Sequence, residues 1–341
     1  MPYPQATDPF RGAEPTYAYT GNFIPEVWSG KLVEKFYSAT VLGAVANTDY
    51  EGEIKNFGDK VQIRSRPTIT IEDYSANLDL TLTRPSGQKQ TLNIDRGKYF
   101  NLGLDDVMEV QADIDMLSLW AEDASEQMKI TIDGDVLNGP TRGDGTGIVN
   151  STLVNAANRG LYAGAISGNQ SSFGLRLGIE SDPTHIAKDN VSAGSGADGS
   201  NEMGVLDYLV NCGTVLDEQN LPESGRFVVI PAWVAGLIKK SDLRDASISG
   251  DGTSILRNGR LGMIDRFTLY LSNVLQPTTS YTASYPVIFG TKAALTFASQ
   301  YVNLETLRSE RSFTNILRGL QVFGFRIVNG VALGYGFVEN N

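Results

Sequence analysis

The fold is decided by residues 102–138, which read LGLDDVMEVQADIDMLSLWAEDASEQMKITIDGDVLN. Apolar side chains recur there at steps of three or four residues, at Val110, Ile114, Leu117, Ala121, Ala124, Met128 and Ile132. This spacing places them in one stripe along an α-helix of about 3.6 residues per turn. Asp105 and Asp106 would lie in the first turn, where the helix dipole favours negative charge. Asn138-Gly139-Pro140 supplies a stop signal, so we predict one unbroken spine helix, roughly 50 Å long.

Two other structures compete for the same pattern. A coiled coil would need a longer heptad repeat with mixed charges beside it. A transmembrane helix is excluded by the acidic residues along the segment. An amphipathic helix packed along one face therefore fits best.

Composition limits the class of protein. The 341 residues are 41% hydrophobic and 9% aromatic, which is enough for one large domain or two ordinary ones. No apolar run approaches the roughly 18 residues of a membrane span, and residues 1–15 lack the pattern of a signal peptide. The single cysteine, Cys212, excludes an internal disulfide framework and fits a reducing cytoplasm. Its surroundings predict a helical core position.

The negative charge is concentrated in one segment. The net charge is −11, and residues 101–150 hold 11 acidic and 2 basic residues. Carboxylates spaced four apart, such as Glu122 and Glu126, indicate a solvated helix face. No basic stripe is present that could neutralise a row of phosphates, which argues against sequence-specific nucleic-acid binding.

The first hundred residues predict an arm and a ribbon. Residues 1–22 are rich in proline and poor in apolar side chains, so they cannot order themselves. A short helix follows from Pro25. Residues 58–99 alternate apolar and polar side chains around a turn at residues 84–89, which predicts a long two-stranded β-ribbon. Such a ribbon is marginal by itself, and no nearby segment offers a third strand, so we expect a second copy of the chain to support it.

The remainder mixes helices and strands. Residues 141–204 are rich in Gly, Ser, Asn and Asp, with short strands expected at 147–154 and 173–179 and a flexible loop at 192–201. Amphipathic helices are expected at 205–216 and 232–240, around a buried strand at 227–230. Further strands are expected at 260–271, 286–289, 301–307, 320–328 and 331–338. No regular βαβ rhythm appears, so the predicted class is α+β.

Signals for catalysis are weak. The only histidine, His185, is expected in an exposed loop, where it cannot serve as an oriented general base. Asp133, Asp135 and Asp144 surround a glycine-rich turn but do not match an EF-hand, and we interpret them as a solvated acidic helix end. No nucleotide-binding or hydrolase motif occurs in its required context. We therefore expect no catalytic, cofactor-binding or metal-binding residues.

Several short motifs occur in a definite order. Lys98-Tyr99-Phe100 and Leu104-Asp105-Asp106 stand where the ribbon meets the spine. Residues 216–231 read LDEQNLPESGRFVVIP, residues 262–273 read GMIDRFTLYLSN, and residues 319–324 read GLQVFG. In this order they resemble the major capsid proteins of tailed double-stranded DNA bacteriophages (Caudoviricetes), which have the Hong Kong ninety-seven type of capsid fold. The resemblance covers roughly residues 22–338.

The resemblance implies a division of the chain into five parts. They are an N-terminal arm with a short helix (1–49), an extended β-hairpin loop (50–100), a peripheral domain (101–204) holding the spine helix 102–138 and the Gly-rich segment 141–204, an apical domain (205–290), and C-terminal strands that return to the peripheral domain (291–341).

The resemblance also implies a function. Hexamers and pentamers would close into an icosahedral shell around double-stranded DNA, with a portal and a scaffolding protein as partners. The resemblance leaves open whether a cement protein joins them. Assembly would take place in the host bacterial cytoplasm, without a membrane. As hypotheses, Arg84, Lys89, Trp28 and Phe36 make assembly contacts, and the acidic spine residues Glu122, Asp123 and Glu126 face the packaged DNA. Some relatives weld subunits through a lysine of the extended loop, but we do not expect this of Lys89.

Three alternatives differ in class from a phage capsid or in what the shell would enclose. An encapsulin-like compartment shares the fold but encloses cargo enzymes. A secreted adhesin or binding module fits the Gly, Thr and Asn content but not the expected absence of a signal peptide. A hydrolase using scattered carboxylates is the third alternative.

Overall fold

The computed structural model divides the chain into residues 1–35 and 36–341, and everything described below belongs to the second unit. The described residues are 38, 40–49, 60–64, 66–67, 69–74, 82, 84–87, 89–106, 116–139, 146–160, 163–164, 175–187, 202–241, 262–277, 284–310 and 312–340. Residues 1–37 of the predicted N-terminal arm, the loop at 192–201 and Asp144 of the sequence predictions lie outside them.

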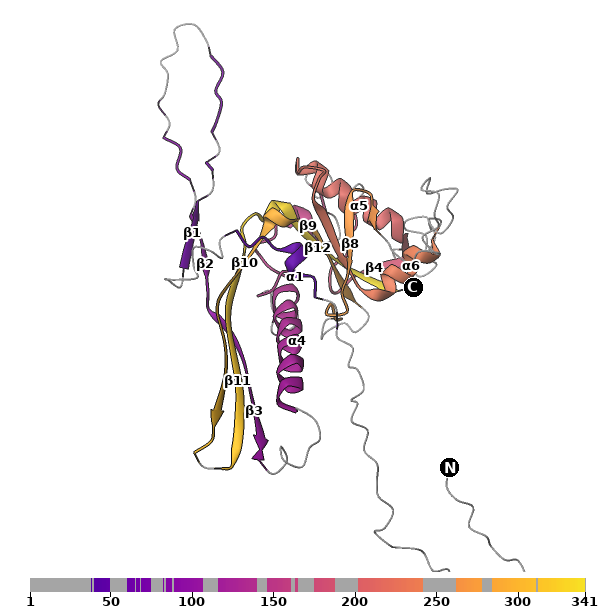
Figure 1. Ribbon diagram of the computed structural model, residues 1–341. Helices are drawn as coiled ribbons and strands as arrows, with labels where there is room; N and C mark the ends of the chain where they lie inside the picture. The colour runs from indigo at the N-terminus through magenta and orange to yellow at the C-terminus, as the bar shows by residue number, and fades with distance from the viewer. Residues whose placement is uncertain are drawn as a thin grey trace, which may run out of the picture. The chain divides into compact units, whose positions relative to one another are not determined.

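A seven-stranded sheet forms the largest layer, in the order β5-β4-β12-β9-β6-β8-β7 (Figure 1). Its strands are β4 (Thr184–Ala187), β5 (Glu202–Gly204), β6 (Arg226–Ile230), β7 (Met263–Ile264), β8 (Phe267–Leu271), β9 (Tyr285–Thr291) and β12 (Leu333–Asn340). Parallel and antiparallel neighbours occur in the same sheet, with β6 parallel to β8 and antiparallel to β9. The predicted α+β class is therefore confirmed.

Two helices cover this sheet, α5 (Val205–Glu218) and α6 (Ala232–Lys240). Strand β6 is buried over its whole length, as its continuous apolar run predicts. Cys212 lies on the buried face of α5, in a core that includes Val215, Val228 and Phe289. The predicted helices at 205–216 and 232–240 and the core position of the cysteine are confirmed.

A second, three-stranded sheet has the order β10-β11-β3. Its strands are β3 (Arg96–Asp105), β10 (Leu295–Arg308) and β11 (Thr314–Ile327), all antiparallel. Figure 1 shows helix α4 (Met116–Leu137) beside this sheet. The far end of α4 enters the core that the two sheets share, where Val136 and Leu137 are fully buried.

The predicted start of the spine helix is wrong. Residues 96–105 are strand β3, so Leu102 and Leu104 pair with Leu317 and Asn315 of β11 instead of beginning a helix. Asp105 therefore does not lie in a first helical turn, and Asp106 forms an ion pair with Arg308. Tertiary pairing decides this boundary, because the local pattern also suits a strand. The predicted end is confirmed: α4 stops at Leu137, and Gly139 takes a φ of 85°.

The ribbon is shorter than predicted and has support within the chain. Strands β1 (Lys60–Arg64) and β2 (Lys89–Asn93) pair antiparallel, whereas Ile69 and Ile71 belong to no strand. The base of the ribbon packs on the three-stranded sheet, where Leu92 and Ala298 are fully buried in one cluster. Within the described residues no third strand joins β1 and β2, as expected, but the base of the ribbon is supported by the chain's own three-stranded sheet.

In the described part of the segment after the spine, turns and isolated bridges stand at 147–154 and at 175–179, where strands were expected. The 3-10 helix η1 (Ala156–Asn158) follows a turn, and Leu175 forms a single bridge to Ala163. The remaining short elements are α1 (Leu42–Val45), η3 (Lys292–Ala294) and η4 (Gly330–Ala332).

The strands of residues 291–341 pair with both of the segments predicted as domains. Strands β10 and β11 pair with β3, but β12 lies between β4 and β9 in the seven-stranded sheet. Its register with β9 runs from Leu333 opposite Gly290 to Val338 opposite Tyr285. The last strand therefore joins β4, from the predicted peripheral segment, to β9, from the predicted apical segment, and the division into domains stays a prediction.

Candidate assembly surfaces

Exposed apolar side chains gather on the ribbon. Ile71 is 88% exposed, Leu82 is 87% exposed and Tyr74 is 79% exposed. Among the residues described here, none covers these side chains. Large apolar groups that stay in water together mark a surface that a partner covers.

A second surface, which mixes apolar and polar side chains, lies on one face of the three-stranded sheet, which we call the outer sheet face. It consists of Tyr99, Asn303, Glu305, Leu307, Ile316, Arg318 and Leu320. The strand register aligns these residues in rows, with Leu320 opposite both Tyr99 and Asn303. Tyr99 is 78% exposed. Arg318 forms an ion pair with Glu305 beside it, and a shallow depression opens between them.

The opposite face of this sheet packs toward α4. Lys98 reaches Asp135 of α4 with 2.7 Å between its Nζ and the carboxylate oxygen. Phe100 lies over Gly319, where an added Cβ would stand 2.3 Å from the ring. Gly319 therefore gives the aromatic ring the space that it needs.

The predicted acidic residues of the spine lie on α4 with different exposures. Glu122 is exposed, whereas Asp123 and Glu126 are half-buried. Glu126 pairs with Lys129 at 2.6 Å. The apolar stripe is half-buried at Leu117 and Met128 and buried only near the helix end, at Ile132.

The four predicted assembly residues are unevenly placed. Arg84 is exposed in a non-strand segment of the ribbon, and Lys89 is exposed at the start of β2, opposite Arg64. Trp28 and Phe36 lie outside the described residues. The assembly role of all four stays a prediction.

The end of α4 is not the solvated acidic terminus that was predicted. Asp133 is 1% exposed, and Asp135 is buried and paired with Lys98. One oxygen of Asp133 accepts the backbone N–H of Val41 at 3.2 Å. Burial raises the pKa of Asp133 to about 6, although hydrogen bonds from the Val41 and Leu42 backbone act to lower it. This carboxylate fastens the start of α1 to the spine.

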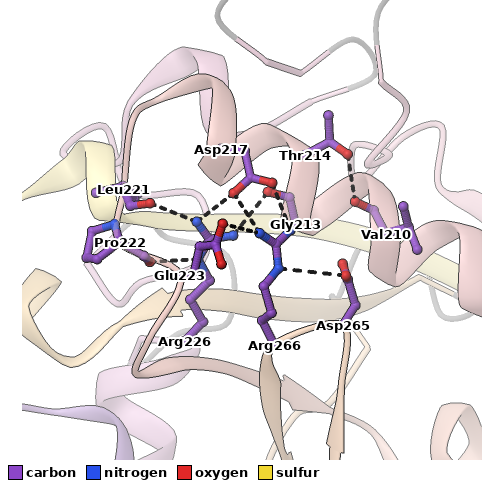
Figure 2. A network of polar contacts seen from close by, with 10 residues as sticks. All are labelled: Val210, Gly213, Thr214, Asp217, Leu221, Pro222, Glu223, Arg226, Asp265 and Arg266. Carbon is purple, nitrogen blue, oxygen red and sulfur yellow. Dashed lines mark hydrogen bonds and ion pairs between the residues drawn. The ribbon is translucent and has the colours of Figure 1, made fainter.

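A polar network that the sequence did not reveal joins α5 to the hairpin β7–β8 (Figure 2). The side chain of Arg226 is completely buried and donates to Asp217 at 2.7 Å. It also donates to the carbonyl oxygens of Pro222 and Leu221, both at 2.9 Å. A buried guanidinium with this many acceptors fixes the loop between α5 and β6.

Arg266 completes the network from the other side. It binds the second oxygen of Asp217 at 2.8 Å and Glu223 at 3.2 Å. Burial acts to raise the pKa of Asp217, but the hydrogen bonds from the two arginines lower it below its usual value. Asp265 and Arg266 both have positive φ, at 44° and 67°, in a two-residue hairpin turn without glycine. Because that turn lacks the usual Asn-Gly signal, the sequence did not mark it.

The cysteine and the histidine of the chain lie on regular elements, Cys212 on α5 and His185 on β4. Burial raises the pKa of the Cys212 thiol well above its usual value. His185 lies on β4 opposite Glu339, and not in the loop that was expected. Within the described ranges, no three His, Cys, Asp or Glu side chains gather into a metal site. Of the helices described, none combines the length and apolar character that a membrane span requires.

The fold of this chain is similar to that of several solved structures. A chain from Mycobacterium phage Che8 aligns with a TM-score of 0.66 and 24% identity, over 94% of this chain and 97% of that one. The capsid of cyanophage P-SCSP1u aligns with a TM-score of 0.62 and 15% identity, over 94% and 93%. The capsid of the native GTA particle aligns with a TM-score of 0.61 and 13% identity, over 96% and 99%.

The chain has the phage capsid fold. It is of the Hong Kong ninety-seven type, which confirms the fold predicted from the order of the motifs. No protein-family model and no curated protein matches the sequence. The evidence for the capsid fold is thus the alignment with solved structures, which agrees with the order of the short motifs in the sequence.

Proposed function

We propose that this protein is the major capsid protein of a tailed bacteriophage, which self-assembles into hexamers and pentamers of an icosahedral shell around double-stranded DNA. The observation that carries the proposal is the match to phage capsids over almost the whole of both chains. The role requires positioning of subunits and no catalysis.

The exposed apolar surfaces support self-association. Ile71, Tyr74 and Leu82 of the ribbon would be covered by neighbouring subunits in a shell, and so would Tyr99 on the outer sheet face. Burying apolar surface contributes roughly 25 cal/mol per Å². Closed symmetry repeats each contact around the particle, so modest interfaces combine into a stable assembly.

We propose that the acidic face of the spine helix repels packaged DNA, and that Glu122 contributes most to this repulsion. Glu122 is exposed and is the best placed of the three residues to repel phosphate, whereas Glu126 is paired with Lys129. A repelling surface would let packaged DNA slide. Replacing Glu122, Asp123 and Glu126 with lysine should hinder packaging, and normal DNA filling of that variant would count against the role.

The remaining partners belong to the same proposal. A portal, a scaffolding protein and a cement protein would act with the shell in the host bacterial cytoplasm. Arg84 and Lys89 are exposed on the ribbon, which supports a place for them in contacts between subunits.

Assembly of the purified full-length chain tests the proposal. Negative-stain microscopy and size-exclusion chromatography should reveal capsomers or shells. The double variant Ile71→Asp, Leu82→Asp should remain folded but lose assembly, because buried charges oppose association. Val210→Asp is the matched control, since Val210 is 48% exposed on α5, away from the ribbon. A wild-type chain that stays monomeric at high concentration, even with scaffold supplied, would refute the proposal.

A further inference from the structure

Three segments of the chain meet in a small polar cavity at the base of the ribbon. They are the junction of β2 and β3, the loop that follows the spine, and the end of β11. The cavity has a volume of about 250 Å³ and is lined by Thr91, Asn93, Asp95, Arg96, Thr146, Gly147, Ser151, Leu153, Phe325, Arg326 and Ile327. Since a water molecule takes about 30 Å³ of liquid volume, the space suits a small ion with a few waters.

Arg96 is held in a fixed position in the wall of this cavity. Its guanidinium carbon lies 4.4 Å from the centre of the Phe325 ring. One terminal nitrogen, Nη2, donates to the carbonyl oxygen of Thr146 at 3.1 Å. The other, Nη1, is buried and has no hydrogen-bond partner among the residues that the structure describes. The Arg96 guanidinium is therefore held in place by Phe325 and Thr146, while its Nη1 still has hydrogen-bonding capacity to spare.

Arg326 lies in the same cavity wall and makes fewer hydrogen bonds to the described residues than Arg96 does. It is half-buried, and its Nε is covered from solvent without a hydrogen-bond acceptor. Neither Arg326 nor Arg96 forms an ion pair with any residue in the described part of the chain. A half-buried guanidinium without an acceptor is costly, because the desolvation of its N–H groups is not compensated.

A shortage of acidic residues does not explain the missing partner, since the chain has 39 acidic and 28 basic residues. Among the described residues that line the cavity, Asp95 is the one carboxylate, and it is exposed and pairs with neither arginine. The cavity thus places two arginines around a space where a negative charge is missing. Guanidinium groups are the side chains best suited to bind oxyanions, through paired N–H donors.

We propose that this cavity binds a free oxyanion no larger than inorganic phosphate, held by the guanidinium groups of Arg96 and Arg326. An ion there would link the base of the ribbon, the loop after the spine and the end of β11. It would satisfy donors that the chain leaves without acceptors. The inference rests on the cavity of the single chain and is independent of the proposed shell function.

Titration of the unassembled full-length chain with inorganic phosphate tests this site. Isothermal calorimetry at constant ionic strength, with chloride as the replaced anion, should show saturable binding at one site. Arg326→Gln should weaken binding about tenfold or more, because a charge-assisted hydrogen bond is lost. Arg318→Gln is the matched control, since Arg318 lies on the same strand but is already paired with Glu305. It should bind phosphate like the wild type.

A variant that strengthens binding guards against misfolding as an explanation. Asp95→Asn removes the carboxylate found among the described lining residues and should bind phosphate more tightly than the wild type, because a repulsive charge is lost. Absence of saturable binding to the wild type would overturn the proposal. So would equal weakening by Arg326→Gln and Arg318→Gln, or unchanged affinity in Asp95→Asn.

Discussion

Replacing Asp133 with asparagine should change how the stability of this protein depends on pH. Asp133 is an almost fully buried carboxylate that holds the start of α1 through the Val41 backbone N–H. Its second oxygen, Oδ1, is buried and has no hydrogen-bond partner. Ionising this group in the folded chain is therefore costly, and its pKa is raised from 3.8 to about 6.

The direction of this pH dependence follows from how many protons the folded and unfolded chains bind. Between about pH 4 and pH 6, folded Asp133 holds a proton that the unfolded chain has mostly lost. Stability from this group is therefore present at low pH and lost as pH rises through about 6. The shift of roughly two pKa units corresponds to about 3 kcal/mol at 1.36 kcal/mol per unit. Of this, about 2 kcal/mol is lost between pH 4.5 and pH 7.5.

Asp133→Asn cannot ionise, so the variant should lack this loss. Its amide keeps an acceptor for Val41 but leaves N–H groups in a buried place, at a cost of about 1–3 kcal/mol. The absolute stability at one pH is thus a poor measure. The useful quantity is the difference between variant and wild type, which should shift by about 2 kcal/mol in favour of the variant from pH 4.5 to pH 7.5.

Urea unfolding of the unassembled subunit at both pH values measures this difference. Glu122→Gln is the control, because it removes a carboxylate from an exposed position of the same helix. Its difference from the wild type should stay nearly constant. If Asp133→Asn and the wild type lose stability in parallel between the two pH values, burial of Asp133 does not control its ionisation, and the reasoning fails.

Three further predictions concern packing and the buried network. Arg226→Met should cost about 3–5 kcal/mol in urea unfolding, because three carbonyls and Asp217 lose a buried donor; Arg266→Met, at a partly exposed ion pair, should cost less than about 1 kcal/mol. Gly319→Ala should cost about 1–3 kcal/mol, since its Cβ would meet the Phe100 ring, and Phe100→Ala in the same chain should recover part of that loss. Leu92→Ala should cost about 2–5 kcal/mol and should expose the ribbon to limited proteolysis, because Leu92 is fully buried at its base.

Strong local patterns made much of this fold predictable. The continuous apolar run of β6 and the amphipathic repeats of α5 and α6 were predicted within a few residues, because each pattern suits only one kind of element at that length. The stop signal at Gly139 was likewise read correctly. The order of these elements and their connecting motifs was enough to predict the capsid fold. Sequence alone therefore determined the class, the order of the main elements and the buried character of α5 and β6.

Long-range pairing decided the rest. Leu104 belongs to a strand because Asn315 lies opposite it, more than two hundred residues later, and no local pattern contains that partner. Asp133 is buried because α1 packs over the end of the spine. From the sequence, an acidic side chain at a helix end was expected to be exposed to solvent. Likewise, the arginines at positions 96 and 326 lie in one cavity only because β3 pairs with β11. Local periodicity is set by neighbours in the chain, whereas burial, register and the placing of charges depend on contacts that only the folded chain creates.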